Sequence, residues 1–314
     1  MKDNQQDYTD LVAKFNDNFA FFSQNYRQSP GKPDLSRVNQ EFVVGKFPIV
    51  WFGDLPNYLN KKNRALKIVT IGLNPAKDET NENKFSWYPK KAVDHKNANN
   101  SAIIKSEIQF YNDYFNNRKQ HPSRYFTRLE ETLNYAFRDF LDADKEKISF
   151  DGPSKMIHID AFSPIATDPS WSELKKDTNT PTVADKIVFG DTNSRQLFAK
   201  RDKVGEPYPQ KSNRVLEDEL YDLLDPDVTI FIGTQSYFEN TLAYNFRNSF
   251  SEAVSSSDNL LEEKAKVYIS KNSTRPRCLI FKRNALSNFT NKEELYDALH
   301  SQKSNLDFLN GRLV

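Results

Sequence analysis

VTIGLNPAKDE, residues 69–79, joins an apolar run to a polar segment through a glycine and a proline. The β-branched residues before Gly72 favour a buried strand, and glycine allows a tight exit and close approach of a ligand. Pro75 fixes its own φ and biases Asn74 toward an extended conformation. The turn therefore holds one amide that can both donate and accept hydrogen bonds, unless it is only an ordinary turn at a strand end.

Other apolar runs of strand length alternate with helical patterns along the chain. The expected strands lie at 47–53, 67–72, 156–162 (a central strand), 228–233, 267–270 and 278–281. The expected helices lie at 8–26, 103–117, 124–142, 214–226 and 291–302. This alternation predicts a three-layer α/β/α fold around a central, mostly parallel sheet. Ligands of such sheets bind beyond the carboxyl ends of strands, where Gly72 and Gly233 lie.

The expected organisation is an N-terminal helical extension, residues 1–40, followed by one α/β domain, residues 41–314. A Pro/Gly stretch at 29–34 separates the two. Residues 163–212 are polar and rich in Asp, Lys, Thr, Ser and Pro, which predicts a long functional loop or insertion in that domain.

Composition excludes several classes of protein. The single cysteine, Cys278, excludes a disulfide framework and any four-cysteine metal site, and the 4 histidines lack the spacing of a metal site or triad. The N-terminus has no apolar core of a signal peptide, and no window approaches a membrane span of about 20 apolar residues. We expect a cytoplasmic monomer without cofactor, metal or membrane partner.

The net charge of +1 does not argue for any class of charged partner, so a nucleic-acid surface must be a local patch. Residues 264–290 provide one, because they contain 7 basic residues and no acidic one. Lys and Arg around a loop suit phosphate contacts, although they also protect a strand edge against self-association.

The turn resembles the first motif of the uracil-DNA glycosylase superfamily. That motif reads G-Q-D-P-Y-H or, in the mismatch-specific uracil and thymine glycosylase branch, G-I-N-P-G. The chain follows the second form, with alanine in place of the last glycine: Gly72, Leu73, Asn74, Pro75 and Ala76. Residues 216–238 look like the family's late helix, proline and glycine-ended strand. The resemblance covers about residues 47–300 and implies the family's α/β fold and base excision from DNA.

KRNALS, residues 282–287, resembles the family's second motif, H-P-S-P-L-S or N-P-S-G-L-S. Leu286 and Ser287 match, and the leucine is the wedge that fills the gap left by the flipped nucleotide. The sequence departs from the motif where Lys282 stands in place of its His or Asn, and Arg283 and Asn284 in place of its Pro-Ser. The expected DNA contacts are Lys271, Arg275, Arg277, Lys282, Arg283, Asn284, Leu286 and Ser287.

The resemblance also implies roles at the base. Asn74 would orient the attacking water as the catalytic residue, and Phe85 would stack on the extruded base, with Trp87 as a competitor. The base pocket would consist of Gly72, Leu73, Pro75, Ala76, Phe85 and Asp160.

Asp160 stands at or near the position where the family commonly has an asparagine that reads uracil. An ionised carboxylate only accepts hydrogen bonds, so it suits the exocyclic amine of cytosine and repels O4 of uracil. Because ordinary cytosine would be a lethal substrate, this points to a modified cytosine, such as the glucosylated hydroxymethylcytosine of some phage genomes. Alternatively, Asp160 caps a turn or pairs with a lysine.

Three functions remain open from the sequence. The favoured one is a monofunctional DNA glycosylase that acts on a modified cytosine in antiviral defence; no lysine can be assigned as a Schiff-base nucleophile, so the product is an abasic site. The alternative is a repair glycosylase for uracil or G·T mismatches. A non-catalytic DNA-binding protein on the same fold is the third, because Lys282 replaces the motif's His or Asn.

Overall fold

The computed structural model of the chain describes residues 9–13, 16, 50–60, 66–72, 100–116, 124–141, 147–150, 155–160, 220–232, 265–269, 278–282 and 292–309. The chain divides into two compact units. One consists of Met1–Val50, Leu73–Tyr111 and Asp160–Leu223, and the other of Trp51–Gly72, Asn112–Ile159 and Leu224–Val314. The expected boundary near residue 40 and the 163–212 segment lie outside the described residues.

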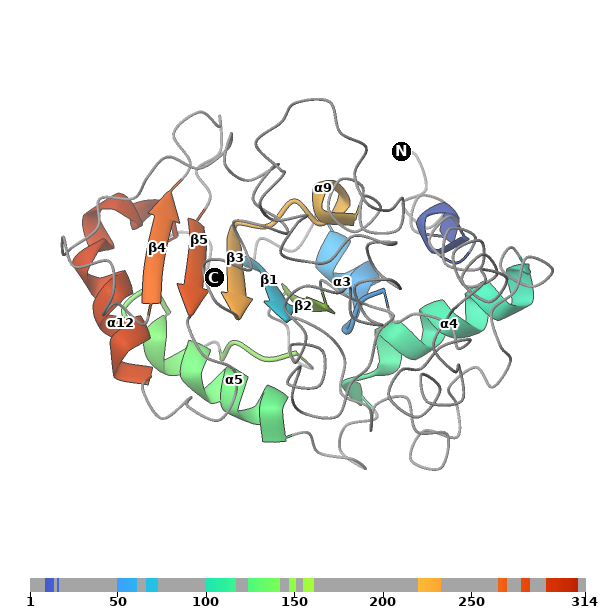
Figure 1. Cartoon of the computed structure of the whole chain (residues 1–314), viewed down its shortest axis with the longest axis horizontal. Helices are drawn as coiled ribbons and strands as arrows, with labels where there is room; N and C mark the ends of the chain where they lie inside the picture. The colour runs from blue at the N-terminus through green and yellow to red at the C-terminus, as the bar shows by residue number, and fades with distance from the viewer. Residues whose placement is uncertain are drawn as a thin grey trace, which may run out of the picture. The chain divides into compact units, whose positions relative to one another are not determined.

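The helices and strands of the described residues follow one another along the chain (Figure 1). In order they are α3 (Leu55–Leu59), β1 (Lys67–Gly72), α4 (Ser101–Asp113), α5 (Arg124–Ala136), β2 (Lys155–Asp160), α9 (Tyr221–Leu224), β3 (Val228–Ile232), β4 (Ala265–Ile269), β5 (Cys278–Lys282), α12 (Lys292–Ser301), η6 (Lys303–Asn305) and η7 (Asp307–Leu309).

The five strands form one sheet in the order β2-β1-β3-β5-β4. β3 runs parallel to both β1 and β5, with Val228 opposite Ile68 on one side and Cys278 on the other. β4 lies at one end and is antiparallel to β5. The expected α/β architecture with a parallel centre is thus present. The expectation that 156–162 is a central strand is wrong, because β2 stands at the other end of the order.

Burial explains why the apolar runs form strands. Val69, Thr70 and Ile71 of β1 are all at most 1% exposed, and a strand buried on both faces reads as a continuous apolar run. Beyond β2, Phe52 adds a single antiparallel bridge to His158. Aromatic side chains fill much of the core, and the rings of Phe115 and Phe150 stack with their centroids 4.2 Å apart.

The expected strand at 47–53 is wrong in the part that the structure describes, residues 50–53, where only the Phe52 bridge forms. The backbone of Gly53 has φ 123°, which ends the extended run. Asp54 then caps α3, because its side chain accepts a hydrogen bond from the Asn57 N–H. Residues 55–59 therefore form a helix that the apolar pattern did not predict.

The helices agree better with their patterns. In the helix expected at 124–142, Phe126, Leu129, Leu133 and Phe137 are all at most 1% exposed, although α5 ends at Ala136 and turns follow it. The expected stop at Pro226 is confirmed, because α9 ends at Leu224. α12 contacts α5 and β4, and Figure 1 shows it beside the β4 edge of the sheet.

Asp227 fixes the start of both central strands. Its Oδ2 accepts a hydrogen bond from the Lys67 N–H at 3.0 Å, and its own N–H donates to the Lys67 carbonyl at 2.9 Å. We expect Asp227→Ala to lower the free energy of unfolding by about 1–3 kcal/mol, because it leaves the Lys67 amide without this acceptor. Urea unfolding checks this. Asp227→Asn keeps a side-chain oxygen, so an equal loss in both variants would contradict the role of the acceptor.

Candidate functional site

The carboxyl ends of β1 and β5 lie at one edge of the sheet, because both strands run parallel to β3. Gly72 ends β1, and Lys282, paired with Ile232, ends β5. Neighbouring strands are about 4.8 Å apart, so two strand spacings place Gly72 and Lys282 about 10 Å apart across β3. The two segments that resemble family motifs therefore begin at the same edge of the sheet.

Only three of the expected site residues fall within the described part of the chain. Gly72 is the buried last residue of β1. Asp160 and Lys282 are the last residues of β2 and β5, and the structure describes their backbone alone. The others lie outside the described residues: Leu73, Asn74, Pro75, Ala76, Phe85, Lys271, Arg275, Arg277, Arg283, Asn284, Leu286 and Ser287.

A buried polar pair joins β1 to β2 behind this edge. The Thr70 Oγ1 and the His158 Nδ1 are 2.8 Å apart, and both side chains are at most 2% exposed. The rings of Phe52, Tyr125 and Phe126 surround the imidazole, with centroids 5.0–5.7 Å away. His158 is therefore a structural residue, and its bond fixes β2 beside the strand that carries Gly72.

A second buried polar pair lies in the first unit and was not expected from the sequence. The Asn16 Nδ2 donates to the Glu107 Oε2 at 2.7 Å, and both residues are fully buried. Burial raises the pKa of Glu107 well above its ordinary value, against the opposing effect of the Asn16 hydrogen bond. Glu107 Oε1 and Asn16 Oδ1 have no hydrogen-bond partner. Burial therefore favours the neutral form of this carboxyl group over its charged form.

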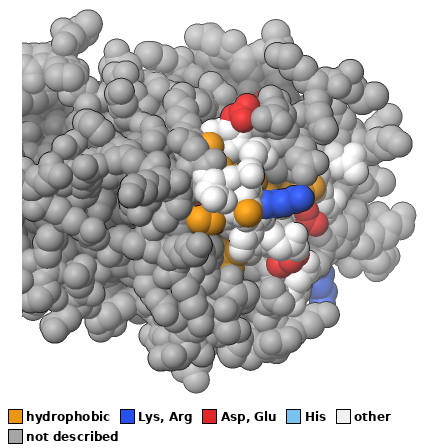
Figure 2. All heavy atoms as spheres, turned by 90° about the vertical axis from the view of Figure 1, so that its right-hand side faces the viewer, with side chains coloured by type: hydrophobic (Ala, Val, Ile, Leu, Met, Phe, Trp, Pro, Cys, Tyr) orange, Lys and Arg blue, Asp and Glu red, His pale blue; other side chains and the backbone are white. Residues whose placement is uncertain are grey.

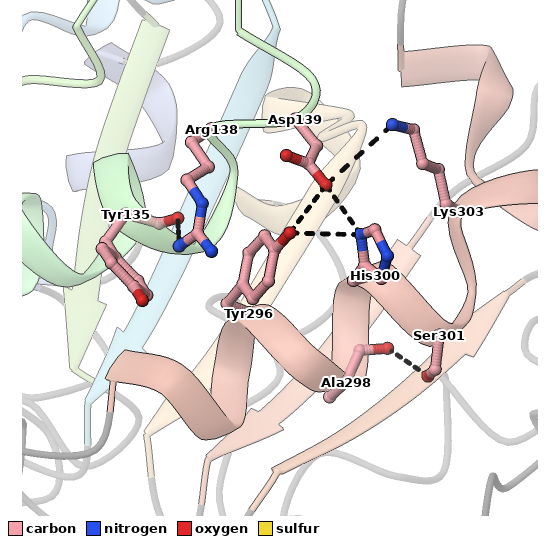
Figure 3. A network of polar contacts seen from close by, with 8 residues as sticks. All are labelled: Tyr135, Arg138, Asp139, Tyr296, Ala298, His300, Ser301 and Lys303. Carbon is pink, nitrogen blue, oxygen red and sulfur yellow. Dashed lines mark hydrogen bonds and ion pairs between the residues drawn. The ribbon is translucent and has the colours of Figure 1, made fainter.

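Figure 3 shows a third group, in which Asp139 joins α12 to the turn that follows α5. The Asp139 Oδ2 accepts hydrogen bonds from the His300 Nδ1 at 2.7 Å and from the Tyr296 hydroxyl at 3.1 Å. The Lys303 Nζ lies 3.9 Å away from the same oxygen. The His300 hydrogen bond is the largest of the effects that lower the pKa of Asp139; Tyr296 and Lys303 add to it and partial burial opposes it.

Arg138 lies against the same group through its guanidinium. The guanidinium carbon is 3.2 Å from the centre of the Tyr296 ring and 4.0 Å from that of Tyr135. Its Nη1 also donates to the Tyr135 carbonyl at 3.1 Å. Lys292 lies over the other ring, with its Nζ 4.6 Å from the centre of Tyr135. Two cations are thus held on aromatic faces at the exposed side of α5 and α12.

The sequence analysis did not single out the Asn16–Glu107 pair or the group around Asp139. A signal for Glu107 exists, because it lies three residues from both Ile104 and Phe110, on the apolar face of α4. The Asp139 group has no such signal. Asp139 and Tyr296 are 157 residues apart, and only the contact of α5 with α12 brings them together.

Among the residues described, no three His, Cys, Asp or Glu side chains lie together as a metal ion would require. No helix within the described ranges is long and apolar enough to cross a membrane. On the face in Figure 2, the described side chains are scattered hydrophobic, acidic and basic groups without a basic patch.

Comparison with known proteins identifies no relative of this chain. No protein-family model matches the chain, and neither the curated proteins nor the solved structures contain a match.

Proposed function

We propose that this chain is a monofunctional DNA glycosylase that flips a modified cytosine from DNA and hydrolyses its N-glycosidic bond. The observation that carries the proposal is the placement of the two motif-like segments. Gly72, the first residue of one segment, ends β1, and Lys282, the first residue of the other, ends β5 on the same edge of the sheet. A base pocket and a wedge that holds the duplex open need this proximity.

The finer fold belongs to the same proposal. A three-layer α/β/α arrangement of the uracil-DNA glycosylase type accounts for a sheet whose inner strands β1, β3 and β5 are parallel. The chain between β1 and β2 contains α4 and α5, and parallel neighbours need a long connection of this kind. A parallel β2 would bring Asp160 to the edge where β1 ends.

The identity of the base rests on Asp160. An ionised carboxylate at the end of β2 would accept a hydrogen bond from the N4 amine of cytosine and repel O4 of uracil or thymine. Residues 163–212 follow directly and would accommodate a bulky group on C5 of the base. Excision of such a base from phage DNA would serve antiviral defence.

In the proposed reaction, positive charge develops on the sugar and negative charge on the departing base. Asn74 would orient a water toward C1′ through its amide oxygen. Backbone N–H groups around Leu73 and Ala76, with Lys282, would stabilise the anionic base. Phe85 would stack on that base and Leu286 would fill the gap in the duplex. Because neutral Asn74 stabilises the sugar cation less than an aspartate would, we expect a slow enzyme.

Abasic sites counted by alkaline cleavage test this function. The oligonucleotides contain uracil, a G·T mismatch, cytosine, hydroxymethylcytosine or glucosylated hydroxymethylcytosine. We expect cleavage only at a modified cytosine, and a loss of at least about a hundredfold in rate for Asn74→Ala, because the water loses its orienting group. Asn305→Ala, an exposed asparagine of η6, is the matched control and should retain the rate.

Asp160→Asn tests the base separately. An asparagine both donates and accepts, so this variant should gain activity on uracil and lose it on the modified cytosine. Cleavage of uracil by the unaltered protein would refute the cytosine assignment and favour a repair enzyme. Binding of DNA without cleavage of any oligonucleotide would favour the non-catalytic alternative.

A further inference from the structure

One side of α12 carries cations and rings in a single line. Lys292, Tyr296 and His300 follow one another at intervals of four residues, and Lys303 of η6 continues the line. Residues four apart lie on the same face of a helix. These four residues are named here the α12 stripe. Within it, the side chains of His300 and Lys303 are 54% and 46% exposed. Glu293 and Asp297 lie one position further on, about 100° around the helix.

Lys303 of the stripe lies beside the Asp139 carboxylate, whereas Lys292 and neighbouring Arg138 lie on aromatic rings. Within the described part of the chain, Arg138 and Lys292 lie on the Tyr135 and Tyr296 rings and pair with no carboxylate. The carboxylate of Asp139 already accepts from Tyr296 and His300. Of the three permanent cations, Arg138, Lys292 and Lys303, only Lys303 thus has a carboxylate beside it among the described residues.

The arrangement suits phosphates better than other anions. A guanidinium stacked on a ring is fixed in one plane, and its remaining N–H donors match the oxygens of a phosphate. From Lys292 to His300 the helix rises about 12 Å, which is the length of roughly three to four nucleotide steps along one strand of a duplex. Both tyrosine rings already carry cations, so they are less suited to anchor an apolar peptide.

We propose that the α12 stripe together with Arg138 binds the phosphodiester backbone of nucleic acid. This surface lies outside the two motif-like segments and adds a sequence-independent contact to the proposed glycosylase, on which the choice of DNA as the polyanion rests. Binding there would hold the protein on a duplex irrespective of the base in the pocket.

The test is the salt dependence of binding, measured by fluorescence anisotropy with a duplex that contains only ordinary bases. Removal of each cation should make the negative slope of log binding constant against log salt concentration shallower by about 0.9. It should also weaken binding roughly five- to tenfold at 0.1 M salt. We expect this for Arg138→Ala, Lys292→Ala and Lys303→Ala. Lys105→Ala removes an exposed lysine of α4 and should change neither quantity.

Three results would overturn the proposal. They are an unchanged slope in all three variants, absence of duplex binding by the unaltered protein at low salt, and competition by polyglutamate equal to that of DNA at matched charge. Excision of bases is scored separately as abasic sites. A protein that excises bases with an unchanged salt slope refutes only this surface, whereas one that binds through the stripe without excision refutes only the proposed reaction.

Discussion

Gly53→Ala should lower the free energy of unfolding by about 3–5 kcal/mol, through backbone strain and a steric clash together. The φ of 123° at Gly53 lies in a region that side chains with a Cβ rarely adopt. A Cβ there would lie 3.0 Å from the Met156 carbonyl oxygen and 3.1 Å from the Ile157 Cδ1. The oxygen belongs to the backbone of β2, so it cannot move without shifting the strand.

The adjacent residue provides the matched comparison for this prediction. Asp54→Ala removes the N-cap of α3 but leaves the backbone conformation unrestricted, so a loss of about 1 kcal/mol is expected. Chemical unfolding of both variants measures the difference. If Gly53→Ala costs no more than Asp54→Ala, the positive φ and the close approach to Met156 do not constrain the chain.

The second large effect is expected at Glu107. Glu107→Ala should lower the free energy of unfolding by about 2–4 kcal/mol, because it opens a cavity beneath α4 and leaves the Asn16 amide without its acceptor. Glu107→Gln has almost the same shape. Its amide can accept from the Asn16 Nδ2 and donate to the Asn16 Oδ1, which has no partner. Because the amide is uncharged at every pH, we expect Glu107→Gln to be more stable than the unaltered protein at pH 7.

The pH dependence separates this explanation from a simple change in packing. The folded state raises the pKa of Glu107 above the ordinary value of 4.5 and so retains a proton that the unfolded chain releases. Stability from this group is complete below the ordinary pKa and falls as the pH rises toward the raised value. Glu107→Gln should lack this fall. Unfolding curves from pH 4 to pH 8 that decline equally in both proteins would contradict a buried neutral carboxyl group.

Much of the sheet could be predicted from the sequence, because each strand contains a short run of apolar and β-branched or aromatic residues. The order of the strands could not. Runs such as 67–72 and 156–162 look alike in the sequence, and only the pairing with Phe52 and β1 places β2 at the end of the order. In the described part of the run at 47–53, residues 50–53, only the Phe52 bridge forms, and the positive φ of Gly53 ends the extended backbone there.

The polar groups were harder to predict than the strands. A glutamate in a helix ordinarily lies in solvent, so Glu107 was not distinguished from the exposed charges of α4. Arg138 and Tyr296 come from elements far apart in the chain, and their contact depends on the packing of α5 against α12. For the motif-like segments, the structure places Gly72 and Lys282 at one edge of the sheet, and the roles of the reactive residues remain predictions.

The pairing of β1 with β3 also determines when the sheet can form during synthesis. Lys67 and its hydrogen-bond partner Asp227 are 160 residues apart. A ribosome that adds about 5–20 residues each second needs on the order of ten seconds or more to cover that distance. Until then β1 cannot pair with β3, and β3 in turn awaits β5. The centre of the sheet is therefore assembled only after most of the chain has left the ribosome, and the entropy of closing so long a loop makes that assembly a slow step of folding.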